Sequence, residues 1–418
     1  MQYDDYKSKY KDATKQHNIM VLVGNGFDIN VLSKYRDDSI DTRYAKFYDF
    51  VKYIGYDKDN ILIRKMDEAK KDGKKNWSDF EALIPEVVKE ESDFEVINKS
   101  LAELQEKFSL FLNDVVTPQI ENALGTASTK NNWAKRSLSS FLGDLDKKNF
   151  KKIKFYANLW HHYVFNFLFI NFNYTSLLDD YIYLDKMQFN PHKYKTVDTN
   201  FSFQANPNNY ENDYNYHLEG NLLFSGYVHT RVIHPHGYQN IPRSLLFGAS
   251  DDKFESDSEM RKFNKDYWTQ YELNYGSLFN NTKLYIIYGS SVGESDKWWW
   301  KNICKTLEKD VDSNETPELI IYSYKTKFNI SSFIDKYASC ESVKDKIRER
   351  IFNVVYDNSD EINFLSLRPE TEEDKNREKF NFSKKSDDSS LILGDEWENI
   401  TSETDDYFKE VFEDEEKL

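Results

Sequence analysis

Short runs of apolar residues, rich in β-branched side chains, are the clearest pattern along the chain. The first is Ile19–Val23, which is followed at once by Gly24. An uninterrupted apolar run of this length is typical of a strand buried on both faces, as in a parallel sheet. Helical patterns separate most of the runs, so the sequence predicts an α/β fold with right-handed crossovers. The later runs are Phe167–Ile170, Thr230–Ile233, Ser244–Phe247, Leu284–Tyr288 and Glu318–Tyr322.

The interval between the first two predicted strands, residues 44–163, has a mainly helical pattern. From Phe94 to Val115 apolar residues recur at spacings of three and four, which indicates one face of a long amphipathic helix. We expect Pro118 to end that helix, because a proline ring breaks the helical hydrogen bonding. The sequence therefore predicts a large helical insertion or lid within the sheet domain.

Changes in composition divide the chain into three parts. Residues 1–16 are a polar N-terminal extension, residues 17–325 carry the predicted Rossmann-like parallel sheet, and residues 326–418 form a C-terminal extension. Within the sheet domain, residues 188–219 are rich in Asn, Tyr and Asp without a clear period, which indicates an irregular loop. From Pro369 the sequence is acidic, apart from short apolar islands such as Leu391–Leu393 and Tyr407–Phe412, and we expect a tail that docks or binds a partner.

Composition narrows the possible environments and partners. The 418 residues are 39% hydrophobic and 16% aromatic, which is enough apolar surface for a large core. The formal net charge of −16 disfavours general binding to nucleic acid or to an anionic membrane, because phosphate contacts need clustered Lys and Arg. No apolar stretch approaches the ~20 residues of a membrane span. We therefore expect a cytoplasmic protein without membrane contact, and nucleic acid is disfavoured as a partner.

The first polar turn after a predicted strand is Gly24-Asn25-Gly26-Phe27-Asp28. Two glycines directly after a first parallel strand let the backbone turn sharply and approach a ligand, and the following helix offers N–H groups to a phosphate. The third glycine of the dinucleotide fingerprint and the P-loop lysine do not occur here. Helix N-capping explains Asp28 equally well.

Two further polar turns follow the second and third predicted strands. In Asn171-Phe172-Asn173-Tyr174-Thr175 the amide of Asn173 suits a ribose hydroxyl or a water, although an Asx-turn at Asn173 and a helix cap at Thr175 are structural alternatives. In His234-Pro235-His236-Gly237 a neutral imidazole suits a general base. A structural histidine is the alternative there, and no third ligand at a recognisable spacing indicates a metal.

The fourth polar turn runs from Gly289 and Ser290 to Asp296 and follows Leu284–Tyr288. Its small residues suit the close approach of a phosphate or ribose, and Asp296 suits ribose hydroxyls, although it also lies where it would cap the next helix. Ligands of open parallel sheets bind beyond the carboxyl ends of the strands. Because all four turns follow strands of one predicted sheet, we expect them to converge on one nucleotide site.

The order of these motifs resembles that of AbiH-type abortive-infection proteins, which act in defence against phage. The matching segments are Gly24–Asp28, Trp77–Glu81, Phe172–Thr175, His234–Gly237 and Tyr285–Asp296. That family in turn is distantly similar to sirtuin-like NAD-binding domains. The resemblance implies an abortive-infection effector that takes NAD as its substrate and responds to a phage-derived trigger, and it allows a homo-oligomer.

The same resemblance assigns roles within the site. It makes Asn173, His236 and Asp28 catalytic, with Asn173 orienting the ribose or water and His236 acting as general base. Thr175 occupies a position where Asp is usual. Two cysteines cannot supply the four zinc ligands of sirtuin deacetylases, so the expected chemistry is hydrolysis of the N-glycosidic bond of NAD without zinc. The expected nucleotide-binding residues are Gly24, Asn25, Gly26, Phe27, Thr175, Gly237, Gly289, Ser290 and Asp296.

Two other functions remain open from the sequence. A metal-dependent nuclease or phosphotransfer effector would take its carboxylates from Asp28, Glu81 and Asp296. A non-catalytic sensor of a nucleotide or a phage protein would signal through the acidic tail. For Glu81, a capping box that begins with Ser78 is an equally good explanation.

Overall fold

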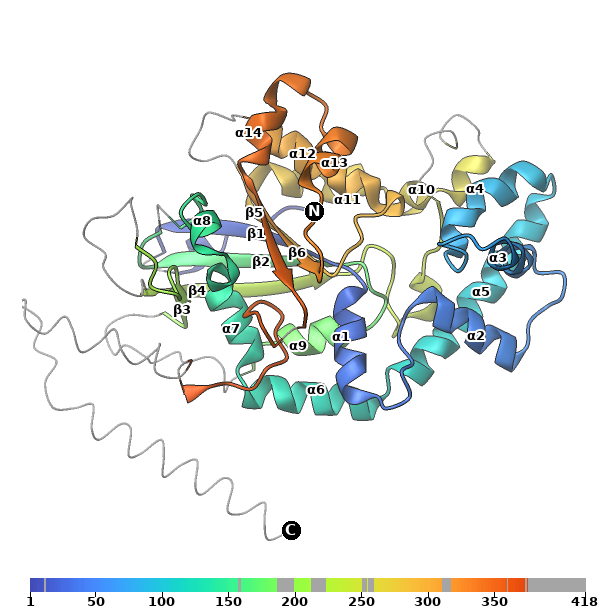
Figure 1. Cartoon of the computed structure of the whole chain (residues 1–418), viewed down its shortest axis with the longest axis horizontal. Helices are drawn as coiled ribbons and strands as arrows, with labels where there is room; N and C mark the ends of the chain where they lie inside the picture. The colour runs from blue at the N-terminus through green and yellow to red at the C-terminus, as the bar shows by residue number, and fades with distance from the viewer. Residues whose placement is uncertain are drawn as a thin grey trace, which may run out of the picture. The chain divides into compact units, whose positions relative to one another are not determined.

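Within the residues that the structure describes, seven strands pair into one sheet in the order β3-β4-β2-β1-β5-β6-β7 (Figure 1). The computed structural model describes residues 1–10, 13–156, 159–185, 199–211, 223–249, 254, 259–309, 317–358, 360–372 and 374. Neighbouring strands run parallel, except that β3 pairs antiparallel with β4. The predicted α/β fold with a parallel sheet is therefore confirmed. The strands are β1 (Lys15–Val23), β2 (Tyr163–Asn171), β3 (Phe201–Gln204), β4 (Leu223–Ile233), β5 (Thr282–Tyr288), β6 (Glu318–Tyr324) and β7 (Ile351–Tyr356).

Helices cover both faces of this sheet. Figure 1 places α12, α13 and α14 on one side, and α1, α6, α7 and α9 on the other. The α-helices of the described residues are α1 (Gly26–Tyr35), α2 (Tyr44–Ile54), α3 (Ile61–Lys71), α4 (Phe80–Glu90), α5 (Phe94–Val115), α6 (Pro118–Lys130), α7 (Trp133–Ser140), α8 (Lys147–Phe150), α9 (Leu177–Ile182), α10 (Lys265–Thr269), α11 (Tyr271–Tyr275), α12 (Lys297–Glu308), α13 (Ile330–Tyr337) and α14 (Lys344–Arg348).

β1 is the central strand, and its alternating side chains separate two hydrophobic cores. Ile19, Val21 and Val23 face the core that includes α1 and the helical insertion. Met20 and Leu22 face the core that includes α12, α13 and α14. All five side chains have no exposed surface. Burial on both faces explains why this strand is apolar at every position from Ile19 onward.

The predicted strand at Ser244–Phe247 is wrong. Ser244 ends a 3-10 turn, and the residues after it do not join the sheet. Leu245 and Phe247 are buried because they pack on the insertion: the Leu245 carbonyl accepts from Gln105 Nε2 at 2.5 Å, and the Phe247 ring meets that of Phe108 edge-on at 5.3 Å. A short apolar run therefore indicates that a segment is buried. It does not show that the segment is a strand, because the backbone can bond to a side chain instead of a neighbouring strand.

The predicted helical insertion is present as α2 to α8. α5 ends at Val115, as the pattern indicated, but Pro118 also begins α6, because the first turn of a helix has no use for the N–H that proline lacks. Figure 1 shows α2 to α5 beyond the end of the sheet where the loop after β4 lies. Glu81 of α4 and Gln105 of α5 both bond to that loop, so the insertion covers the carboxyl edge of the sheet.

β3 lies inside the segment 188–219 that we expected to be irregular. That prediction is wrong for Phe201–Gln204, whose four residues are all buried and pair with β4. Much of the rest of this segment lies outside the described residues. The islands Leu391–Leu393 and Tyr407–Phe412 of the acidic tail also lie outside them.

The sheet unit continues past Lys325, where we expected a C-terminal extension to begin. β7 pairs with β6, and residues 362–367 are all buried. The chain divides into one compact unit of Met1–Glu370 and a second of Thr371–Leu418. The boundary of the sheet unit therefore lies at Glu370. Asn353 interrupts the apolar run of β7, which removed the pattern that would have revealed this strand.

We predict that Phe364→Ala lowers the free energy of unfolding by about 3–5 kcal/mol, as expected for a large side chain removed from a packed core. Phe364 has no exposed surface and stacks on Tyr322 of β6 at 5.2 Å. Leu273→Ala, at a side chain that is 76% exposed, should change it by less than about 0.5 kcal/mol. Equal effects of the two substitutions in urea unfolding would contradict an integral role of residues 362–367.

Candidate functional site

The loops after β1 and β5 touch one another through their glycines. Gly26 N donates to Gly289 O at 2.8 Å, and Gly24 N donates to Tyr288 O at 2.9 Å. A Cβ atom on Gly26 would lie 2.6 Å from Gly289 Cα, and Gly289 has a φ of +64°, which favours glycine. The glycines therefore allow two strand ends to meet closely, and the amides of Gly24 and Gly26 are used within the protein.

Asp28 joins the first turn of α1 to the loop after β2. The side chain has no exposed surface; its Oδ1 accepts from Asn173 Nδ2 at 2.9 Å and its Oδ2 from Thr175 Oγ1 at 2.7 Å. Burial raises the pKa of Asp28 to about 7, against the lowering effect of these hydrogen bonds. Asp28 and Thr175 thus bond to one another, and neither acts as a helix cap. We assign Asp28 a positioning role because both of its oxygens are occupied.

Asn173 and His234 connect the loops after β2 and β4. Asn173 Nδ2 donates to Gly24 O at 3.2 Å as well as to Asp28, which leaves Oδ1 as the part of this amide that can contact a ligand. His234 Nδ1 lies 3.1 Å from the Asn173 carbonyl, and its Nε2 lies 2.9 Å from Asp179 Oδ2. The His234 ring thus links the loop after β4 to the loop after β2 and to α9. The Asx-turn belongs to Asn171, whose Oδ1 accepts from Asn173 N.

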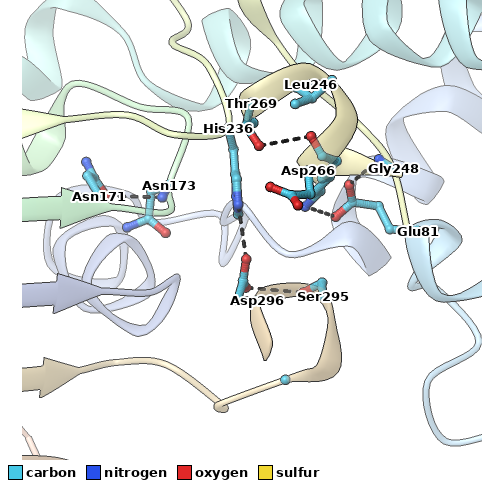
Figure 2. Close-up of polar contacts among 12 residues, drawn as sticks. Glu81, Asn171, Asn173, His236, Leu246, Gly248, Asp266, Thr269, Ser295 and Asp296 are labelled. Carbon is cyan, nitrogen blue, oxygen red and sulfur yellow. Dashed lines mark hydrogen bonds and ion pairs between the residues drawn. The ribbon is translucent and has the colours of Figure 1, made fainter. Parts of the chain in front are cut away.

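His236 and Asp296 face one another across the carboxyl edge. His236 is 3% exposed and stacks on Phe172 at 5.3 Å, and its Nε2 lies 3.0 Å from Asp296 Oδ1 (Figure 2). The two atoms are at ion-pair distance, and neither has another hydrogen-bond partner in the described part of the chain. Asp296 occupies the N-cap position of α12 without capping it.

Contacts with neighbouring side chains keep the Asp296 carboxylate ionised. Burial raises the pKa of Asp296, but His236 and Lys265 outweigh that effect and leave it below its ordinary value. Asp296 Oδ2 accepts from Ser295 Oγ at 3.1 Å. Oδ1 therefore faces His236 Nε2 and accepts from no other donor among the described residues.

Glu81 of α4 forms a second buried polar group. Its Oε1 accepts from Gly248 N at 3.0 Å (Figure 2). Its Oε2 accepts from Lys265 Nζ at 3.0 Å and from the Tyr44 hydroxyl at 2.9 Å. Glu81 and Lys265 are 6% and 2% exposed. The predicted capping box is wrong, because Asp79 caps α4. Glu81 instead holds the segment that carries Lys265 next to Asp296.

Lys265 was missed by the sequence analysis. Burial lowers its pKa, but Glu81 and Asp296 outweigh that effect and raise it, so this lysine carries its charge inside the protein. It lies in a polar segment between two strands with no periodicity that would mark a buried position. Only the long-range contact with Glu81, 184 positions away, identifies it.

Several buried polar atoms around these loops have no hydrogen-bond partner among the described residues. Native proteins leave few such atoms, since each costs about 1–3 kcal/mol. A group of them at one edge indicates a place where a ligand or water completes the bonding. They are Asn171 Nδ2, His236 Nε2, Tyr271 OH, Asp296 Oδ1 and Trp299 Nε1.

Two of the expected nucleotide-binding residues have clear structural roles. Phe27 is 1% exposed and meets the Tyr181 ring edge-on at 5.4 Å inside the core. The Asn25 amide oxygen accepts from the Thr42 hydroxyl. Both residues hold the glycine loop in place.

Gly237 and Ser290 shape the backbone of their loops. Gly237 has a φ of +98°, and a Cβ atom there would lie 2.0 Å from Ser244 O. Ser290 Oγ accepts from Val292 N at 3.1 Å. Val292 has a φ of +53°, which is strained for a β-branched residue, and strain of this kind gathers at functional sites.

The carboxylates of the metal-dependent alternative do not gather. The carboxylate oxygens of Asp28 and Glu81 accept hydrogen bonds from donors within the protein, as described above. Across the part of the chain that the structure describes, no group of three or more His, Cys, Asp or Glu side chains is arranged to hold a metal ion.

A family model described as bacteriophage abortive infection AbiH matches residues 20–314, which include all four strand-end loops. The chain belongs to the AbiH family. No curated protein matches the chain. The resemblance drawn from the motifs is thereby confirmed, and the loops that meet at the carboxyl edge are those of an AbiH protein. Among the described residues of this AbiH protein, no helix is long and apolar enough to cross a membrane.

We predict that Gly26→Ala destabilises this AbiH protein by about 1–3 kcal/mol, because a new methyl group would force the two glycine loops apart. Gly293→Ala, in the loop after β5, should be tolerated, since its Cβ would meet no atom closer than 3.6 Å. Thermal unfolding of both variants tests this. A tolerated Gly26→Ala would show that the loops have room to separate.

We predict that Asp28→Asn changes how stability depends on pH. With a folded-state pKa of about 7, Asp28 keeps a proton that the unfolded chain releases near pH 4. Wild-type stability should therefore fall relative to the variant between about pH 4 and pH 7, by at most about 1.4 kcal/mol per pH unit. Asp49→Asn, at an exposed position of α2, should follow the wild type. Parallel curves for wild type and Asp28→Asn would contradict the raised pKa.

Proposed function

We propose that this AbiH protein acts in anti-phage defence as a hydrolase that cleaves the N-glycosidic bond of NAD or a related nucleotide. One observation carries the proposal: His236 and Asp296 are buried together at the carboxyl edge, 3.0 Å apart, and neither Nε2 nor Oδ1 bonds to any other described group. In open α/β sheets this edge is where ligands bind, and the gap between β1 and β5, where the strand order reverses, is the preferred position.

The attacking water is bound by His236 and by Asn173. In the proposed reaction the substrate separates His236 Nε2 from Asp296 Oδ1, and the neutral imidazole takes the proton of the water at Nε2 as a general base, a role that contributes about 10²–10⁴ in rate. Asn173 Oδ1 accepts from the water or from a ribose hydroxyl, because its Nδ2 is already held by Gly24 and Asp28. The oxygen of the water forms a bond to the anomeric carbon as the bond to the nicotinamide nitrogen breaks. The products are nicotinamide, ADP-ribose and one proton.

Asp296 stabilises the positive charge that develops during this reaction. The transition state of glycosidic cleavage resembles an oxocarbenium ion, so an ionised carboxylate beside the ribose lowers its energy. The same carboxylate stabilises the imidazolium that His236 becomes. The ion pair between Lys265 and Glu81 holds the segment next to Asp296 in place.

The glycine loop contributes shape to this site. The N–H groups of Gly24 and Gly26 are bonded within the protein. We therefore infer that the loop lets the ends of β1 and β5 meet closely, which brings Asp296 toward His236. Phosphate binding at this loop stays a prediction, and it requires the two loops to separate.

We predict that His236→Gln and Asp296→Asn each reduce NAD hydrolysis at least 100-fold. The assay measures NAD, nicotinamide and ADP-ribose with purified protein and in phage-infected cells that express each variant. Hydrolysis should continue in the presence of a chelator. NAD loss at the wild-type rate in both variants would refute the proposed site.

His229→Gln serves as the matched control. His229 lies earlier on the same strand β4, where its Nε2 bonds to the Tyr10 hydroxyl at 2.7 Å. This variant should keep wild-type hydrolysis. A loss equal to that of His236→Gln would indicate a general effect on folding.

A further inference from the structure

Tyr271 is a buried tyrosine whose hydroxyl makes no hydrogen bond with the described residues. The side chain is 2% exposed. Thr269, on the same segment, donates its hydroxyl to the Lys265 carbonyl at 2.9 Å. A buried hydroxyl left in this state costs free energy, and replacing such a group with an apolar one is close to neutral or stabilising.

The backbone around Tyr271 is built to direct this ring inward. Gln270, directly before it, has a left-handed φ of +46°, which is uncommon for a residue other than glycine. Asp266 Oδ1 accepts from Tyr271 N at 2.9 Å and fixes the start of α11. The ring lies against the first turn of α12, 5.2 Å from Trp298 and 5.7 Å from Trp299. Asp296, at the N-terminus of that same helix, is thereby brought near it.

The electrostatic surroundings agree with this placement. Burial raises the pKa of Tyr271 well above its ordinary value, and the carboxylates of Asp296 and Glu81 raise it further, against a lowering effect of the Thr269 side chain. The phenol therefore keeps its proton and can donate it in a hydrogen bond. Asp296 Oδ1, by contrast, is ionised and can only accept.

The chemical group that completes these bonds must both accept and donate. It accepts from the Tyr271 hydroxyl and donates to Asp296 Oδ1. A phosphate oxygen has no proton to give and would be repelled by the carboxylate, whereas a hydroxyl does both. We propose that Tyr271 and Asp296 together bind a sugar hydroxyl of the ligand, which makes Tyr271 a further binding residue of the site. This inference rests on the proposed function for its choice of ligand.

The first test compares Tyr271→Phe with Tyr275→Phe by thermal unfolding without ligand. Tyr275 is the matched control, since it lies one turn later in α11 and its ring packs on Trp299 at 5.4 Å. Tyr271→Phe should unfold at the wild-type temperature or a few degrees above it, because it removes an unpaired buried hydroxyl. A melting temperature clearly below those of wild type and Tyr275→Phe would mean that this hydroxyl bonds within the protein, and would overturn the inference.

The second test measures the binding of ADP-ribose and of ADP, which lacks the second ribose, by calorimetry. Wild type and Tyr275→Phe should bind ADP-ribose about tenfold more tightly than ADP, and Tyr271→Phe should lose most of that preference. An unchanged preference in Tyr271→Phe would overturn the inference and leave the proposed function intact. Failure of wild type to bind ADP-ribose, with Tyr271→Phe more stable than wild type, would overturn the proposed substrate and support Tyr271 as a ligand-binding residue.

Discussion

The buried carboxylate of Asp28 fixes how the loops of the site meet. A carboxylate held away from water needs a donor for each oxygen, and Asn173 and Thr175 supply them from the loop after β2. The same Asn173 bonds to Gly24 through its side chain and to His234 through its carbonyl. One buried carboxyl group thus sets the relative positions of the segments that follow β1, β2 and β4, and the geometry of the site depends on it.

Much of the fold followed from hydrophobic pattern alone. Four strands, β1, β2, β5 and β6, are buried along most of their length, so their apolar runs stood out, and the insertion was visible from the helical spacing of α5. The failures have a common cause. The run at Ser244–Phe247 is buried by contacts with the insertion, while β3 and β7 are edge strands with polar residues in them. Both kinds of error depend on packing between distant segments, which local pattern does not record.

The site was predicted in part. Strand-end position and residue type led to Asn173, His236 and Asp296, since parallel strands bring their carboxyl ends to one edge. Lys265 and Tyr271 were missed because they lie in an irregular polar segment whose burial is decided by Glu81 and by the first turn of α12. The glycines were predicted as ligand-binding residues. In the structure they allow the loops after β1 and β5 to contact one another.

The central position of β1 has a consequence for the order in which the chain folds. Asn18 of β1 bonds to Asn166, 148 positions later, and to Asn281, 263 positions later. Pairings between such distant segments form slowly, because a long loop must close before any contact is gained. During synthesis the first strand leaves the ribosome well before either of its neighbours exists. A defence protein assembled in this way holds no finished site until most of its polypeptide has been translated.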